Sequence, residues 1–286
     1  APCVTMLPSR QPRIVNGQPV GSASAAPFIA LQYDGGTDPA QTYFCGGSLI
    51  AERWILTAAH CLYRNPERQL RVEVTLHRDD VSLSASAEGG VVRRVAAAVE
   101  HPDYAADNWF SDAALLYLNE SVVEIEPVAL DDGSVGIGSV EVPALLLGWG
   151  SLDERCNVYG TTLNMAEIPV LTDEQCVDEL SALDYHAVRV LCAGAPAPNA
   201  TGRNQWVEAG CADSGGPLVV PNATAAGGPV QVGVVAWAYG NSPGIYTRVA
   251  WLQNWIIDTM QLYAPPSQPP GLPPPPPPPS APTSTP

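Results

Sequence analysis

The sequence predicts an all-β fold that ends in one helix. Short runs rich in aliphatic and aromatic residues recur from residue 28 to residue 249, separated by Gly, Pro and Asp. Short strands at close spacing, with turn residues between them, are typical of a sandwich or a barrel. After the last of these runs the apolar residues fall at helical spacing instead. Together the two patterns define the predicted fold class.

The predicted strands occupy both halves of the chain. In the first half they are residues 28–33, 48–50, 54–56, 71–76, 91–99, 114–118 and 144–147. In the second half they are residues 166–171, 190–193, 217–220, 231–237 and 244–249. The periodicity identifies the strands but does not say how they pair.

Two helices are predicted in the second half. Thr172-Asp173-Glu174-Gln175 has the capping-box pattern, in which Thr and Gln side chains satisfy free N–H groups, and it should open a helix through Leu180. The C-terminal helix is expected over residues 249–262. Its apolar residues at helical spacing are Trp251, Leu252, Trp255, Ile256 and Met260. We expect the tryptophans to anchor this helix to the core.

Composition and charge narrow the classes of partner. The chain has 286 residues, of which 46% are hydrophobic, enough for a sizeable core. All 13 basic residues are arginine, and with 29 acids the net charge is −16. This charge disfavours nucleic acid and anionic membrane surfaces as partners. No apolar run reaches the roughly 20 residues that span a bilayer.

Both ends differ in composition from the rest. Residues 1–13 contain three prolines and no periodicity, and they are interpreted as a leader. Because the chain starts with Ala1 rather than Met, we expect a cleaved signal peptide. Residues 264–286 include seven consecutive prolines, Pro273–Pro279, and should form an extended polyproline II tail. A passive spacer is the favoured interpretation of this tail, and a cell-wall anchor is the alternative.

Three motifs carry the chemistry. Ser214 lies in the glycine-rich stretch Gly210-Cys211-Ala212-Asp213-Ser214-Gly215-Gly216-Pro217, where glycines let the backbone approach a substrate. His60 lies in Thr57-Ala58-Ala59-His60-Cys61, and Asp112 precedes Ala113-Ala114-Leu115-Leu116. A serine needs a base to become nucleophilic, and histidine can serve near neutral pH. A base, its orienting carboxylate and a nucleophile therefore follow in the order His, Asp, Ser.

With a fourth motif, Arg13-Ile14-Val15-Asn16-Gly17, the chain resembles the trypsin/chymotrypsin-like serine protease family from about Ile14 to Tyr263. The resemblance implies two six-stranded antiparallel β-barrels with the active site between them. It implies a protease domain over residues 14–263 that hydrolyses peptide bonds through an acyl-enzyme, without cofactor or metal. His60, Asp112 and Ser214 are then the catalytic residues.

The resemblance also assigns an oxyanion hole and an activation site. The oxyanion hole would use the backbone N–H groups of Ala212 and Ser214. The family has glycine where this chain has Ala212, so the backbone is more restricted there. Cleavage after Arg13 would free the Ile14 amine to pair with Asp213, since a buried carboxylate is costly unless paired. The protein is therefore expected to be made as a zymogen.

The specificity pocket departs from the family. Counting back from Ser214 without a gap puts Glu208 at the pocket base, which favours Arg or Lys before the scissile bond. A count shifted by one puts Ala209 there and removes that preference. The other predicted pocket residues are Ala236, Trp237, Ala238 and Gly244. Ala238 replaces a glycine, which should restrict bulky side chains.

The seven cysteines suggest an oxidising compartment. The resemblance implies the disulfides Cys45–Cys61 and Cys176–Cys192. A Cys156–Cys211 bond at the pocket lip is predicted next, which leaves Cys3 unpaired within the chain; the competing pairing is Cys3–Cys156. The three N-x-S/T sequons, which are compatible with a secreted glycoprotein, are Asn119, Asn199 and Asn222.

The sequence thus favours a secreted, monomeric endopeptidase. Its expected partners are protein and peptide substrates, and protein protease inhibitors. The alternative function is that of a protein-binding module: a weak or inactive protease homologue that binds proteins through its active-site cleft. Ala212 and Ala238, which replace glycines of the family, motivate this alternative. A wall-associated structural protein rests on the proline tail alone.

Overall fold

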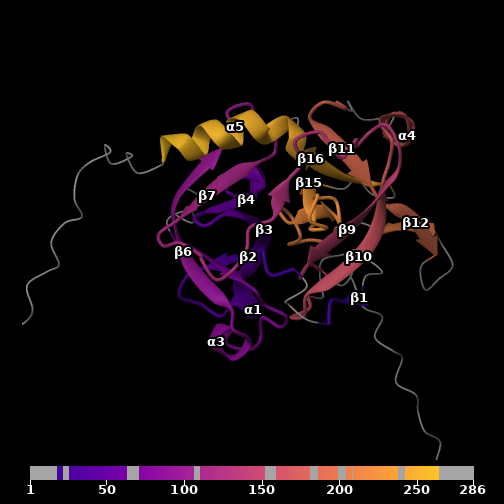
Figure 1. Cartoon of the computed structure of the whole chain (residues 1–286). Helices are drawn as coiled ribbons and strands as arrows, with labels where there is room; N and C mark the ends of the chain where they lie inside the picture. Colours follow the sequence, from indigo (N-terminus) through magenta and orange to yellow (C-terminus); the bar gives the residue numbers. More distant parts are fainter. Residues whose placement is uncertain are drawn as a thin grey trace, which may run out of the picture.

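The computed structural model describes residues 18–21, 26–62, 71–105, 110–151, 159–180, 186–198, 204–207, 209–237 and 242–263. Two β-barrels lie side by side, and a helix crosses the top of the first in the view of Figure 1. Arg13, Ile14, Cys3, Cys156, Glu208, Ala238 and the proline tail, on which several sequence predictions depend, lie outside the described residues.

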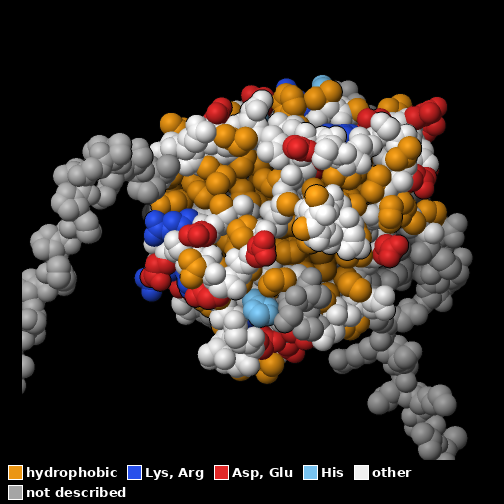
Figure 2. Space-filling model, viewed as in Figure 1, with side chains coloured by type: hydrophobic (Ala, Val, Ile, Leu, Met, Phe, Trp, Pro, Cys, Tyr) orange, Lys and Arg blue, Asp and Glu red, His pale blue; other side chains and the backbone are white. Residues whose placement is uncertain are grey.

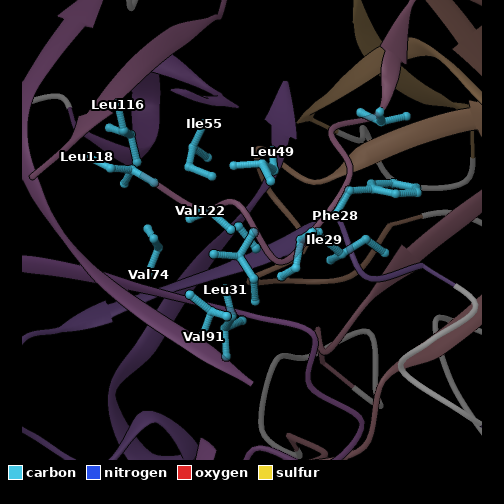
Figure 3. Close-up of a cluster of buried hydrophobic side chains, with 14 of the residues drawn as sticks. Phe28, Ile29, Leu31, Leu49, Ile55, Val74, Val91, Leu116, Leu118 and Val122 are labelled. Carbon is cyan, nitrogen blue, oxygen red and sulfur yellow. The ribbon is translucent and has the colours of Figure 1, made fainter. Parts of the chain in front are cut away.

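The first barrel is a closed antiparallel sheet in the order β2-β3-β4-β7-β6-β5. Its strands are β2 (Ile29–Asp34), β3 (Tyr43–Ala51), β4 (Trp54–Thr57), β5 (Val72–Leu76), β6 (Val91–Glu100) and β7 (Ala114–Leu118). Inward-facing side chains fill it completely, as alternation along strands requires. Figure 3 shows this core, which includes Phe28, Ile29, Leu31, Leu49, Ile55, Val74, Val91, Leu116, Leu118 and Val122.

The second barrel closes in the order β9-β10-β11-β16-β15-β14, with β14 returning to β9. Its strands are β9 (Val142–Gly148), β10 (Asn164–Val170), β11 (Val190–Ala193), β14 (Pro217–Val220), β15 (Val230–Trp237) and β16 (Gly244–Arg248). The short strands β1 (Gln18–Pro19) and β8 (Ala129–Leu130) add to β10 and β15. The two six-stranded antiparallel barrels expected from the family resemblance are confirmed.

The two predicted helices are also confirmed. In α4 (Asp173–Glu179) the Thr172 hydroxyl accepts from Gln175 N at 3.2 Å, and the Gln175 side chain accepts from Thr172 N at 2.8 Å. Helix α5 (Val249–Leu262) buries Leu252 and Ile256 against the first barrel. The chain therefore returns from the second barrel to cover the first.

Some elements were not predicted. Strand β3 begins at Tyr43 rather than at residue 48. The prediction missed its first residues because Gly46 and Gly47 have low β propensity, although their backbones pair with β2. Gly47 lies so close to β4 that an added Cβ would come within 2.7 Å of Ile55 Cγ2. The hairpin of β12 (Ala195–Pro198) and β13 (Asn204–Val207) was missed because alternate prolines obscure β12. Helices α1 (Pro39–Thr42) and α3 (Ala85–Glu88) and the 3₁₀ helix η2 (Ala59–Cys61) are too short to show a period.

Polar contacts join the two barrels. The Ser48 hydroxyl on β3 donates to Gln231 Oε1 on β15 at 2.6 Å, and both side chains are buried. The loop between β5 and β6 also reaches the second barrel, since Val81 N donates to Thr161 O at 2.9 Å. These directional bonds add to the apolar packing that the two barrels share in fixing their relative positions.

The face seen in Figure 2 carries hydrophobic side chains across its middle, with acidic side chains scattered around them and arginine at few places. This distribution agrees with the net charge of −16. Within the described residues, no helix is both long and apolar enough to cross a membrane.

Candidate active site

His60 lies in the turn that follows strand β4 at one end of the first barrel. Strand β4 ends at Thr57, and the chain turns into η2, whose Cys61 forms a disulfide with Cys45 on β3. This bond braces the turn that carries His60. The imidazole is 21% exposed, so one ring edge reaches solvent while the rest is packed.

Asp112 orients the imidazole through two contacts. Its Oδ2 lies 2.6 Å from His60 Nδ1, and its Oδ1 accepts from the backbone N–H of His60 at 2.9 Å. The carboxylate is fully buried, and the Thr247 hydroxyl donates to the Asp112 carbonyl oxygen at 2.9 Å. An acid bonded at Nδ1 places the ring proton there and leaves Nε2 as the acceptor.

Ser214 lies on a tight turn from the second barrel. Its carbonyl oxygen accepts from Gly46 N at 2.8 Å, which ties the turn to β3 of the first barrel. Gly215 follows with φ +80°, and an added Cβ there would lie 2.1 Å from Thr57 Oγ1. Only glycine fits this close approach of the two barrels.

The Cys45–Cys61 disulfide contacts both His60 and Ser214. Cys61 Sγ lies 4.0 Å from His60 Nε2 and 3.7 Å from the Ser214 carbonyl oxygen. The same sulfur atom thus contacts the imidazole and the turn that carries Ser214. The group of Cys45, His60 and Cys61 is not a metal site, because both sulfurs belong to a disulfide.

Ala212 has a left-handed backbone with φ +70°. A non-glycine residue in this region costs roughly 1–2 kcal/mol. The residue is partly exposed beside Ser214. The strain accounts physically for the preference for glycine at this position, and here it is tolerated.

Asp213 is buried in a cradle of backbone N–H groups. Its Oδ1 accepts from Gly150 N at 2.8 Å, and its Oδ2 accepts from Gly210 N at 2.8 Å. Burial raises the pKa of the Asp213 carboxyl to about 6, although both N–H donors oppose that shift. Gly148 and Gly150 are needed here, because a Cβ on either would lie within 2.2 Å of a carboxylate oxygen.

The predicted pocket residues that the structure describes all belong to the second barrel or pack against its core. Ala209 packs against that barrel's core, and Ala236 and Trp237 end β15. Gly244 begins β16 opposite Ala193. Sequence reasoning missed Tyr246, which is fully buried and whose hydroxyl would lie 3.2 Å from a Cβ at Gly244. Its alternation with Gly244 along β16 is the signal that could have found it.

Two of the predicted disulfides are present in the structure. Cys45–Cys61 and Cys176–Cys192 are disulfide-bonded, with S–S distances of 2.00 Å in each. Cys211 is also disulfide-bonded, and its partner is not among the described residues. The second bond joins α4 to β11, so it closes the loop between them.

Comparisons with known proteins agree with this geometry. The trypsin family model matches residues 14–256. Trypsin alpha of Drosophila erecta is 31% identical over 264 residues, which cover 89% of this chain and 90% of that protein. Trypsin II-P29 of Gallus gallus is 30% identical, covering 77% of this chain and 81% of that one. Coagulation factor XII of Cavia porcellus is 32% identical over 85% of this chain, which spans 40% of that longer protein. The chain therefore belongs to the trypsin family and is a serine-type endopeptidase.

Proposed function

We propose that this endopeptidase is a secreted zymogen that uses His60, Asp112 and Ser214 as its catalytic triad. The observation that carries the proposal is the 2.6 Å contact between His60 Nδ1 and buried Asp112, on a turn whose Cys61 Sγ lies 3.7 Å from the Ser214 carbonyl oxygen. A histidine in this setting is pre-oriented as a base for a serine hydroxyl.

The proposed reaction follows from these positions. Ser214 Oγ attacks the scissile carbonyl carbon while its proton moves to His60 Nε2, and Asp112 stabilises the resulting imidazolium. The Ala212 and Ser214 N–H groups stabilise the oxyanion. As the C–N bond breaks, His60 donates its proton to the leaving amine. Water then attacks the acyl-enzyme, with His60 again as the base.

Activation is proposed to follow cleavage between Arg13 and Ile14. Asp213 is buried with two N–H donors and an elevated pKa, so its charged form would be stabilised by a cation. The new Ile14 ammonium is the proposed cation. Its pairing would hold the Ala212–Ser214 turn in the conformation that aligns the N–H donors.

The proposed primary specificity is for Arg or Lys before the scissile bond. Glu208, which follows Val207 in the sequence, would supply the negative charge at the pocket base. Glycine at 244 keeps a side chain away from the Tyr246 hydroxyl, since a Cβ there would lie 3.2 Å from it. If the shifted count holds, Ala209 forms the base and the preference for a cation disappears.

Secretion is supported by the disulfides, which form and persist in oxidising compartments. We propose Cys156 as the partner of Cys211, and peptide mapping without reduction tests this pairing against Cys3–Cys156. Residues 14–263 form the proposed protease domain, and residues 264–286 are a spacer. The enzyme is proposed to act as a monomer on proteins and to be a target of protein inhibitors.

Active-site labelling tests the proposal. The protein is cleaved after Arg13, Ile14 is verified as the new terminus, and a serine-directed fluorophosphonate is added. An adduct on Ser214, absent from the uncleaved protein and from His60→Ala, is expected. Absence of an adduct on correctly cleaved, folded protein would refute the proposal and favour a protein-binding homologue. Peptide libraries with wild type and Glu208→Gln then test the preference for Arg and Lys.

A further inference from the structure

Tyr43 joins the first barrel to the loop that cradles Asp213. It opens β3, and its hydroxyl lies 3.0 Å from the carbonyl oxygen of Trp149 and 2.9 Å from that of Gly160. A phenol carries one proton, which it donates to these two acceptors. Because Trp149 and Gly160 belong to the segment between β9 and β10, a residue of the first barrel closes a loop of the second.

The Trp149 carbonyl is one end of a peptide group whose other end binds Asp213. The same peptide unit carries the Gly150 N–H, which donates to Asp213 Oδ1 at 2.8 Å. A peptide group is planar, so its oxygen and hydrogen turn together. Tyr43 and Asp213 therefore fix one peptide plane from its two ends, and a flip of that plane would break both hydrogen bonds.

The surroundings of Tyr43 keep its hydroxyl protonated, so that it can donate a hydrogen bond. Its ring is half-buried and packs edge-to-face on Tyr159 with the centroids 5.8 Å apart. Burial and the charge of Asp213 raise the pKa of the Tyr43 phenol, so it keeps its proton at neutral pH. Hydrogen bonds in series also polarise one another, which strengthens the bond to Asp213.

We propose that Tyr43 is a positioning residue that sets the Trp149–Gly150 peptide against Asp213 and thereby favours the turn conformation in which Ala212 and Ser214 N–H groups are aligned. This inference rests on the catalytic roles proposed above for that turn. Tyr43 touches neither substrate nor nucleophile, and it acts through the peptide it holds.

Tyr43→Phe tests the inference, because it keeps the ring and removes the hydroxyl. In the cleaved enzyme we expect a decrease in kcat/KM of about 3- to 10-fold, the effect of losing one hydrogen bond, carried by kcat rather than KM. Tyr159→Phe is the matched control: that side chain is 47% exposed, and we expect kcat and KM to stay unchanged.

A second readout does not depend on activity. In the uncleaved Ser214→Ala background, Tyr43→Phe should increase hydrogen exchange at the Gly150 and Gly210 amides, which both donate to Asp213, at least severalfold, while the strands of the first barrel keep wild-type exchange. Unchanged exchange at Gly150 and unchanged kcat would overturn the inference. Faster exchange throughout the molecule would also overturn it, since that result indicates general destabilisation. Failure of fluorophosphonate labelling in the wild type would refute the proposed function but leave this exchange test valid.

Discussion

Replacing Arg78 should destabilise the protein far more than replacing an exposed arginine. Arg78 lies in the loop between β5 and β6, and its side chain is 1% exposed. Its guanidinium donates to Glu88 Oε2 at 2.7 Å and to Thr75 Oγ1 at 3.1 Å, and it also contacts the carbonyl oxygens of Asp80 and Leu83. A buried charge thus organises the whole loop.

The magnitude follows from what each substitution leaves behind. Arg78→Met leaves the Glu88 carboxylate, itself 11% exposed, without its cation. Removing one partner of a buried ion pair costs about 3–5 kcal/mol. Glu88→Gln keeps an oxygen acceptor for the backbone N–H groups of Asp79 and Asp80 but leaves the buried Arg78 cation without its anion, so we expect a cost of about 3–5 kcal/mol here too. The double variant leaves no unpaired charge and should cost less than the sum.

Urea unfolding followed by tryptophan fluorescence measures these costs, in the Ser214→Ala background to prevent self-digestion. Arg94→Met is the control, because that arginine is 79% exposed and 3.5 Å from Glu73, and its loss should cost under about 1 kcal/mol. A cost for Arg78→Met equal to that of the control would refute the reasoning. Strict additivity in the double variant would refute the role of charge pairing.

Three further predictions concern the turn before Ser214. Ala212→Gly relieves roughly 1 kcal/mol of left-handed strain and should raise kcat/KM about 2- to 5-fold in cleaved enzyme. Gly150→Ala places a Cβ 2.2 Å from Asp213 Oδ2, so fluorophosphonate labelling should slow by at least about 10²-fold. In uncleaved Ser214→Ala protein, the Asp213 pKa of about 6 exceeds the usual 3.8, so the native state binds the proton more tightly than the unfolded state. The free energy of unfolding should therefore fall by about 2 kcal/mol between pH 4 and 6.

Two of these three predictions have a control variant, and the third has an outcome that would contradict it. Asp213→Asn should remove the decrease in stability between pH 4 and 6, and an unchanged decrease would assign it to another group. Ala144→Gly changes a fully buried alanine of β9 in unbroken pairing with β10, away from the pocket residues, so it should not raise kcat/KM. If Gly150→Ala labels at the wild-type rate, the glycine is not required by the Asp213 cradle.

Most of the fold could be predicted from local sequence. Strands β7, β11 and β14 and helix α5 begin and end where the apolar pattern does, because each has a side that must be buried. Pairing could not be predicted this way, since the closure of β9 on β14 joins residues far apart in sequence. It came from the family resemblance alone.

The site was less predictable than the fold. The motifs around His60 and Ser214 are local, so their spacing identifies them. Tyr43 gave no local signal, because its partners are the carbonyl oxygens of Trp149 and Gly160, and any residue could supply those. A hydrogen bond from a side chain to a distant backbone has no sequence pattern until the fold is known.

The contact between Ser48 and Gln231 has a consequence for how this enzyme fails. The proposed base and its acid come from one barrel and the proposed nucleophile comes from the other, so the reacting atoms would lie on both sides of the interface between the barrels. A displacement of about one ångström between two intact barrels is enough to reduce turnover strongly. Hydrolytic activity should therefore be lost at a lower denaturant concentration or temperature than the native circular dichroism of the sheets. Ser48→Ala removes a 2.6 Å hydrogen bond across the interface between the barrels. It should increase the difference in denaturant concentration or temperature between loss of activity and loss of the native circular dichroism.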